Sequence, residues 1–244
     1  MLDLLIRKLD NHVVLGVEDK AALAALPHEV RDLNAGSYIV REGTAPGACP
    51  VLLEGFAYRQ KLASNGERQI VSLHIPGDAL DLQHLFLDCA DHSVQALTKI
   101  TVASIPRSAL RQLAMARPVI AHAFAVSNQI EASINREWVL NVGRRDAKMR
   151  IAHLLCEIAA RLAERDLLTV YGLELPMTQE QIGDATGLTS VHVNRMLKTL
   201  ELEGWIERDG RAIRFPNWEG MRRIADFSPL YLHLGRQTAA GASA

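Results

Sequence analysis

The residues best suited to chemistry in this sequence gather between positions 178 and 198, near its carboxyl end. They combine hydroxyl, amide and imidazole groups with two cations and one small apolar side chain. Such groups bind base edges and phosphates, which lie close together in the major groove of DNA. The candidates for these contacts are Thr178, Gln179, Thr189, Ser190, Val191, His192, Asn194, Arg195 and Lys198.

Helix signals around these residues predict a helix-turn-helix. Thr178 and Gln181 have the spacing of a capping box, in which each side chain binds the other residue's amide, and this predicts a first helix over 179–186. The glycine that follows allows a tight turn, and Thr189 caps a second helix that occupies residues 189–200. The second helix turns its apolar residues inward: Val193, Met196, Leu197 and Leu200.

Two strand-like stretches after the second helix predict a hairpin wing. They cover residues 204–208 and 211–215, and the Asp209-Gly210 pair between them favours a tight turn. Gly210 and Arg211 lie at the expected tip, where they would contact the DNA backbone without recognising sequence. The alternative is that the whole segment is a small helical packing module with solvated charges.

Composition excludes several other classes of protein. The chain has 244 residues, 48% of them hydrophobic, which is enough for two domains with a core each. Its formal net charge of -1 gives no global attraction to nucleic acid, so DNA binding must come from a local surface. Its three cysteines form no CxxC pair, which argues against a disulfide framework or a metal site. The cysteines predict a reduced, cytoplasmic protein, and since no apolar run is long enough to span a bilayer, we expect no membrane partner.

Closely spaced turn signals in the first part of the chain predict a set of short strands. Asn65-Gly66 is the clearest hairpin turn, because both residues tolerate positive φ. The stretches between turns are rich in β-branched and aromatic residues. The predicted strands are 38–40, 51–53, 56–62, 69–73, 93–97 and 100–105. This pattern is typical of a small roll or barrel.

Beyond Pro106, apolar residues recur at helical spacing and predict a short helix, a break at Arg117-Pro118 and a long helix. The apolar stripe contains Leu110, Leu113, Ile120, Phe124, Ile130, Ile134 and Trp138. A stripe on so long a helix needs a partner, and a second copy of the chain is the simplest one. The alternative is that the helix packs on its own roll, since periodicity does not distinguish the two.

Together these segments predict an α+β chain with an N-terminal, jelly-roll-like β-roll, a long dimerisation helix and a C-terminal winged helix-turn-helix. The expected boundaries are 1–106 for the roll as effector or sensor domain, 107–143 for the dimerisation helix, 144–227 for the DNA-binding domain and 228–244 for a tail. A hinge is expected at 141–150, where Gly143 precedes a cluster of cations.

Over most of its length, from Leu23 to Asp226, the sequence resembles the Crp/Fnr family. Its members join a β-roll of the cyclic-nucleotide-binding type to a long dimerisation helix and a winged helix-turn-helix. The resemblance rests on residues 36–43, 53–55, 75–78, the helix up to Trp138, and 178–198.

The resemblance implies a role for several residues of the second helix. Thr178 and Lys198 fall on phosphate-contacting positions, while Ser190, Val191 and Arg195 face bases. Arg195 keeps the guanine-contacting arginine of the family. Ser190 and Val191 do not keep the Arg-Glu pair of the catabolite activator branch, so we expect a different half-site.

The effector positions depart further from the family. Where cyclic-AMP-binding members hold the ribose and phosphate with a Gly-Glu and an Arg-Ser pair, this chain has Asp81-Leu82 and His92-Ser93. A mostly neutral histidine lacks the permanent cation that a buried phosphate needs, and Asp81 would repel the anion. Arg136, on the helix stretch that faces the pocket in the family, could compensate. We expect no cyclic AMP binding and no cofactor, with an effector that the sequence does not name.

The other candidate ligands are an iron–sulfur cluster, haem and metal ions. The cysteine cluster of the oxygen-sensing members is missing, so no iron–sulfur cluster is expected. His74, His84 and His92 offer haem or metal ligation as an alternative to ordinary hydrogen-bonded histidines, which we favour.

The sequence therefore predicts a homodimeric regulator that binds a pseudo-palindromic site in double-stranded DNA, with RNA polymerase as a further partner. One alternative is a cyclic-nucleotide-responsive regulator, and another is a ligand-binding module without a DNA role. An enzyme on the β-roll is not expected, because the sequence has no nucleophile elbow, paired metal-ligand motif or phosphate-binding glycine loop.

Overall fold

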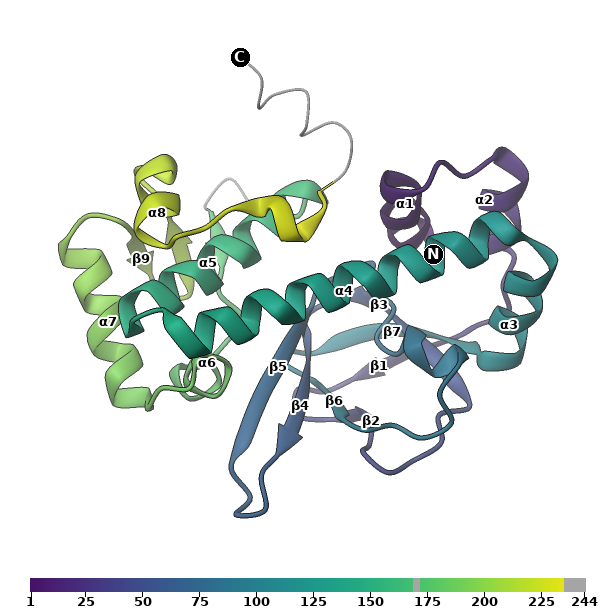
Figure 1. The fold of residues 1–244 in the computed structure, drawn as a ribbon, viewed down its shortest axis with the longest axis horizontal. Coiled ribbons are helices and arrows are strands. Elements are labelled where there is room, and N and C mark those ends of the chain that lie inside the picture. The colour runs from purple at the N-terminus through teal and green to yellow at the C-terminus, as the bar shows by residue number, and fades with distance from the viewer. Residues whose placement is uncertain (169–171, 235–244) are drawn as a thin grey trace. The chain divides into compact units, whose positions relative to one another are not determined.

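A computed structural model describes residues 1–168 and 172–234 of the chain (Figure 1). They form two compact units, one of Met1–Gly66 with Val71–Ala132 and one of Ser133–Leu234 with Glu67–Ile70. The last part of the expected tail, residues 235–244, lies outside the described residues. Over the described ranges, no helix is long and apolar enough to cross a membrane.

The first unit contains the predicted β-roll. One antiparallel sheet has the order β1-β7-β3, with β1 (Glu29–Leu33), β7 (Ile100–Pro106) and β3 (Ala48–Glu54). The other has the order β2-β6-β4-β5, with β2 (Tyr38–Val40), β6 (Ser93–Ala96), β4 (Ala57–Leu62) and β5 (Arg68–His74). The sequence does not predict β1, because four of its five residues are exposed and it lacks apolar alternation.

Apolar side chains fill the roll and join it to the helices of the first unit. Its helices are α1 (Asp3–His12), α2 (Val17–Ala24), the 3-10 helix η1 (Leu82–Leu85), α3 (Arg107–Ala116) and the start of α4 (Pro118–Arg144). The interior of the roll includes Val40, Leu52, Leu80, Val94, Ile100 and Val102. A further cluster includes Leu5, Leu9, Leu23, Ile105, Leu110, Ile120 and Phe124. Each such side chain contributes about 1.5–3 kcal/mol by leaving water.

The break at Arg117-Pro118 is confirmed, but the expected use of the apolar stripe is wrong. Most of the stripe is buried within the chain itself, namely Leu110, Ile120, Phe124, Ile130 and Trp138. Ile120 and Phe124 pack into the core of the first unit, as the alternative proposed, because the sheet and α1 offer them an apolar surface. A different face of α4 is exposed, with Val119, His122, Ala125 and Gln129.

The second unit contains the predicted winged helix-turn-helix. Its elements are α5 (Ala147–Glu164), β8 (Leu173–Glu174), α6 (Gln179–Thr186), α7 (Ser190–Leu202), β9 (Glu207–Asp209), β10 (Ala212–Arg214), α8 (Trp218–Ile224) and the 3-10 helix η2 (Pro229–Leu232). Strands β8, β10 and β9 form an antiparallel sheet in that order. Helix α5 is buried from Ile151 to Leu162 and contacts α6, α7, α8 and η2, so it is the centre of this unit.

Candidate nucleic-acid interface

Helix α6 begins with the capping box that the sequence predicts. Thr178 Oγ1 accepts a hydrogen bond from the Gln181 amide at 3.2 Å, and Gln181 Oε1 accepts one from the Thr178 amide at 2.9 Å. The box satisfies amides that have no partner within the helix. Because the Thr178 hydroxyl accepts here, its own proton remains available for donation to a phosphate oxygen.

The turn between α6 and α7 brings the two helices into close contact. Gly187 has a φ of 68°, a left-handed conformation that glycine adopts without strain. The Leu188 amide donates to Gly183 O at 3.1 Å, and a Cβ on Gly183 would lie 2.3 Å from Leu188 O. Thr189 Oγ1 then caps α7 by accepting from the His192 amide at 3.3 Å. These contacts fix where α7 starts and how closely it approaches α6.

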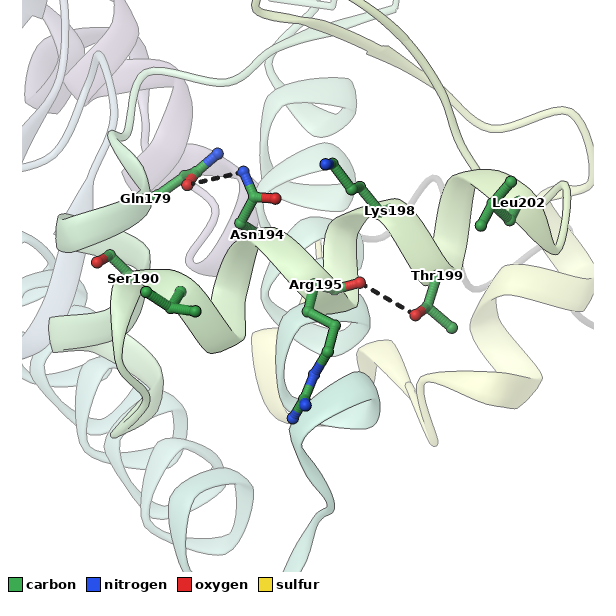
Figure 2. Close-up of a pocket in the computed structure, with 8 residues that line it drawn as sticks. Gln179, Ser190, Asn194, Arg195, Lys198, Thr199 and Leu202 are labelled. Carbon is green, nitrogen blue, oxygen red and sulfur yellow. Dashed lines mark hydrogen bonds between the residues drawn. The ribbon is translucent and has the colours of Figure 1, made fainter.

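An open groove of about 570 Å³ runs along α7, and Figure 2 shows the side chains that line it. One lining residue comes from the start of α6 and the others from α7: Gln179, Ser190, Val191, Asn194, Arg195, Lys198, Thr199 and Leu202. The α7 members share a face because they are spaced by three, four and seven residues or lie next to such positions. None of these lining residues carries a carboxylate. We refer to this surface as the α7 groove.

The cations of the α7 groove are available for a partner. Arg195 and Lys198 are exposed, and within the described chain their side chains form no ion pair or hydrogen bond. Two other cations of the second unit are instead compensated: Lys148 lies 2.9 Å from Glu203, and Arg208 lies 2.7 Å from Glu201. The groove therefore concentrates uncompensated positive charge beside neutral hydrogen-bonding groups, which suits phosphates and guanine edges.

The structure brings most of the predicted DNA-contacting residues together, but not all. Thr178 and Thr189 cap the two helices, and His192 is half-buried on α7 outside the groove lining. Gly210, with a φ of 60°, and Arg211 lie in the turn of the β9-β10 hairpin, so they belong to the wing.

Two lining residues, Thr199 and Leu202, were not predicted. Helix α7 extends two residues beyond its expected end at Leu200, and Leu202 is 89% exposed. Leu202 follows Arg195 by seven residues, so the helical period places it on the same face. This seven-residue spacing is the signal in the sequence that identifies Leu202 as a lining residue.

The predicted effector residues are only partly brought together. Asp81, Leu82 and His92 are buried in the first unit, where Leu82 is part of an apolar cluster. Ser93 is half-buried, and its Oγ accepts a hydrogen bond from the Glu42 amide at 3.0 Å. Arg136 is exposed and lies on the part of α4 that belongs to the second unit.

A buried group of charges surrounds Asp81. His84 Nδ1 donates to Asp81 Oδ1, and His92 Nε2 lies 3.7 Å from the same oxygen. Burial raises the pKa of Asp81, and the hydrogen bond from His84 opposes this shift. Burial also lowers the pKa of His92, which disfavours its cationic form. Neither Asp81 nor His92, whose cationic form burial disfavours, therefore offers a positive charge to an anionic ligand.

The buried cation nearest to this group was not predicted. Arg59 on β4 donates from Nη1 to Glu131 on α4 and from Nη2 to Leu80 O, the latter at 3.0 Å. Its side chain is 7% exposed. Glu131 compensates the charge of Arg59, so little remains for a phosphate. Over residues 1–168 and 172–234, no group of three or more His, Cys, Asp or Glu side chains is placed to hold a metal ion.

A second buried network supports the helix-turn-helix from behind. Glu157 on α5 accepts hydrogen bonds from Trp138 Nε1 at 3.0 Å and from the Tyr231 hydroxyl at 2.8 Å. Burial raises the pKa of Glu157. One turn earlier, His153 stacks on Tyr231, and burial together with the charge of Arg145 lowers the pKa of His153 to about 3. The network ties the end of α4 and η2 to α5, on which α7 packs.

Comparison with known proteins agrees with this geometry. Residues 149–224 match a model of the Crp-like helix-turn-helix domain, and residues 30–117 match a model of the cyclic nucleotide-binding domain. The probable transcriptional regulator flp of Lacticaseibacillus casei is 30% identical over 213 residues, covering 86% of this chain and 93% of the relative. The transcriptional activator protein FnrA of Stutzerimonas stutzeri is 24% identical over 211 residues, or 86% of each chain. The solved structure of FixK2 from Bradyrhizobium japonicum matches with a TM-score of 0.75 and 26% identity, covering 83% of this chain and 100% of that one.

Proposed function

This chain belongs to the Crp/Fnr family of DNA-binding transcription regulators, and from that premise we propose that it binds a pseudo-palindromic DNA site as a homodimer. One α7 would enter the major groove at each half-site, with the two half-sites about 34 Å apart. The α7 groove carries the proposal, because it presents uncompensated cations and neutral hydrogen-bonding groups on one helix face.

The groove residues divide into two kinds of contact. Arg195 would contact a guanine through two hydrogen bonds, which discriminates by about 1–3 kcal/mol against other bases. Ser190 and Val191 lie one turn earlier on the same face and would meet neighbouring bases. Lys198 and Thr178 would contact phosphates, which adds affinity without sequence preference.

The wing and the helix ends add further backbone contacts in this proposal. Arg211 is exposed next to the turn glycine Gly210 and would reach a flanking phosphate. Thr189, Gln179 and His192 lie at or near the ends of the two helices that approach DNA, where amides and short polar groups favour phosphate oxygens.

The exposed face of α4 supports the homodimer. Val119, His122, Ala125 and Gln129 are exposed at a spacing of three to four residues, opposite the buried stripe. We expect Ala125→Glu to separate the two copies in sedimentation, because it would place a charge in the helix contact. Ala116→Glu, at another exposed alanine, on α3, is the matched control. A dimer that persists in Ala125→Glu at low concentration would place the contact on another face.

The buried charges in the roll support a regulator that does not take cyclic AMP. Asp81 places carboxyl oxygens where a cyclic phosphate would need a cation, and Arg59 already pairs with Glu131. Calorimetry with cyclic AMP should therefore detect no heat of binding. Tight binding would contradict this part of the proposal.

The partner and location follow from the DNA role. The relative FnrA is named a transcriptional activator, so we infer that RNA polymerase is a partner of this chain as well. A regulator of this kind meets the bacterial chromosome in the cytoplasm. We infer that it acts there by binding and not by catalysis.

Selection from randomised duplexes tests the DNA role. We expect the full-length protein to enrich an inverted repeat at moderate salt, and Arg195→Ala to lose more affinity for that repeat than for random DNA. Arg223→Ala removes an exposed cation from α8 in the same unit and is the matched control. Failure of the wild-type chain to enrich any inverted repeat would reject the proposed function.

A further inference from the structure

The side chain of Asn194 is held in place by the other helix of the motif. Its Nδ2 donates a hydrogen bond at 3.1 Å to Oε1 of Gln179, the first residue of α6, and Figure 2 shows the two amides facing each other. Asn194 is half-buried, and both residues line the α7 groove next to Arg195. The contact therefore sets the direction of an amide that would otherwise sample several rotamers.

The remaining hydrogen-bonding capacity of Asn194 matches one base. An asparagine amide has two N–H donors and a carbonyl acceptor, and Gln179 uses one donor. Within the described residues, the second N–H and Oδ1 make no hydrogen bond. A donor beside an acceptor complements the major-groove edge of adenine, which presents an N7 acceptor beside an N6 donor. Guanine presents two acceptors there and cytosine a donor, so neither satisfies both groups.

The pair is also oriented before any DNA binds. Gln179 lies between the two capping-box residues Thr178 and Gln181, and α7 starts at its own Thr189 cap. Binding would therefore require little new ordering of these side chains. Contacts made by groups that are already oriented retain more of their energy as affinity and specificity.

The neighbouring residue on the same face favours an A·T-rich contact. Val191 precedes Asn194 by three residues, and its side chain is 79% exposed. Its methyl groups suit the thymine methyl but supply no acceptor for the amino group of cytosine. The absence of a carboxylate among the lining residues of the α7 groove removes the other group that would select cytosine.

We propose that Asn194, oriented by Gln179, recognises an adenine in each half-site, in addition to the guanine contacted by Arg195. This inference rests on the proposed binding of α7 in the major groove. It identifies Asn194 as a specificity-determining residue and Gln179 as a positioning residue.

The test compares base preferences of full-length variants on the repeat that the wild-type chain selects. Asn194→Ala is expected to lose about 5- to 150-fold of discrimination at one A·T pair per half-site, the equivalent of about 1–3 kcal/mol, while its preference for guanine stays. Asn194→Asp is expected to shift the preference at that pair towards cytosine, because a carboxylate accepts from the cytosine amino group. Gln179→Ala should weaken the adenine preference less than Asn194→Ala.

Asn135→Ala is the matched control. It makes the same change at an exposed asparagine of α4 that does not line the α7 groove, so it should leave every base preference intact. Unchanged base preferences in both Asn194 variants would overturn the inference. If Arg195→Ala still loses its guanine preference in that case, the proposed function stands without it. If the wild-type chain selects no sequence at all, both fail together.

Discussion

Replacing Gly183 with alanine tests whether the close approach of α6 and the following turn determines the position of α7. Gly183 is buried, and its backbone oxygen accepts a hydrogen bond from the Leu188 amide at 3.1 Å. A Cβ at this position would stand 2.3 Å from Leu188 O, about 1.1 Å inside the 3.4 Å at which ordinary contact begins. The atom it meets is backbone, so relief requires the turn itself to move.

The expected cost combines two opposing effects. Overpacking of this kind costs about 1–3 kcal/mol, and a clash with backbone belongs at the upper end. Alanine offsets about 1 kcal/mol of this through its better helix propensity. The net loss of about 2 kcal/mol should lower the melting temperature of the second unit by about 8–15 °C. A displacement of α7 by about 1 Å would also misplace Arg195 and weaken specific DNA binding by about 5- to 150-fold.

Thermal unfolding and DNA-binding titrations measure the two effects. Gly143→Ala is the control for unfolding, because it is the same change in a helix of the same unit and its Cβ would have nothing within 4 Å. That variant should melt at or above the wild-type temperature. If Gly183→Ala keeps both the melting temperature and the DNA affinity of the wild type, the Leu188 carbonyl moves freely and the reasoning is refuted.

Three further measurements test buried groups. Burial lowers the pKa of His153 to about 3 in the folded chain from 6.5, so the unfolded chain takes up the proton first as the pH falls. Relative to His153→Leu, the wild-type free energy of unfolding, measured with urea, should therefore fall by about 2 kcal/mol between about pH 7 and 5. The same pH dependence in both proteins would contradict this. Cys89 is exposed, whereas burial raises the pKa of the two other thiols to about 12, so iodoacetamide at about pH 8 should label Cys89 alone in the folded chain. Glu131→Gln removes the charge that compensates buried Arg59 and should lower the free energy of unfolding by about 1–3 kcal/mol. Exposed Glu18 is the control, since Glu18→Gln should change the free energy of unfolding by less than about 0.5 kcal/mol. Equal effects of the two substitutions would show that Glu131 stabilises the fold no more than an exposed carboxylate does.

The helix-turn-helix was predictable because its signals are local. The capping box at Thr178, the left-handed Gly187 and the cap at Thr189 each act through residues within three or four positions along the chain. Such features leave a pattern that a single sequence displays. The wing follows the same rule: the Asp209-Gly210 signal marks the hairpin, although the turn itself consists of Gly210 and Arg211, because Asp209 pairs with Ala212.

The interior of the roll was not predictable for the opposite reason. Arg59 pairs with Glu131, which is 72 residues away along the chain, and no local pattern links the two. Gly183 in the second unit was not predictable either. Glycine is needed there because the backbone of the turn lies close by, and not because φ is positive. Strand β1 pairs with β7 through its backbone while four of its five residues are exposed, so the sequence lacks the alternation that usually reveals a strand.

Helix α4 shows where periodicity stops being informative. An apolar stripe fixes which face of a helix leaves water, but any apolar surface can supply the partner, whether it belongs to the same chain or to another. Here the large side chains, such as Phe124, pack within the chain's own core. The exposed face carries smaller or more polar residues such as Ala125 and Gln129. A contact between two copies on that face would rely on close approach of the helices more than on buried bulk. Truncation of Phe124 should therefore destabilise each copy at every concentration, whereas a charge at Ala125 should act on the association alone.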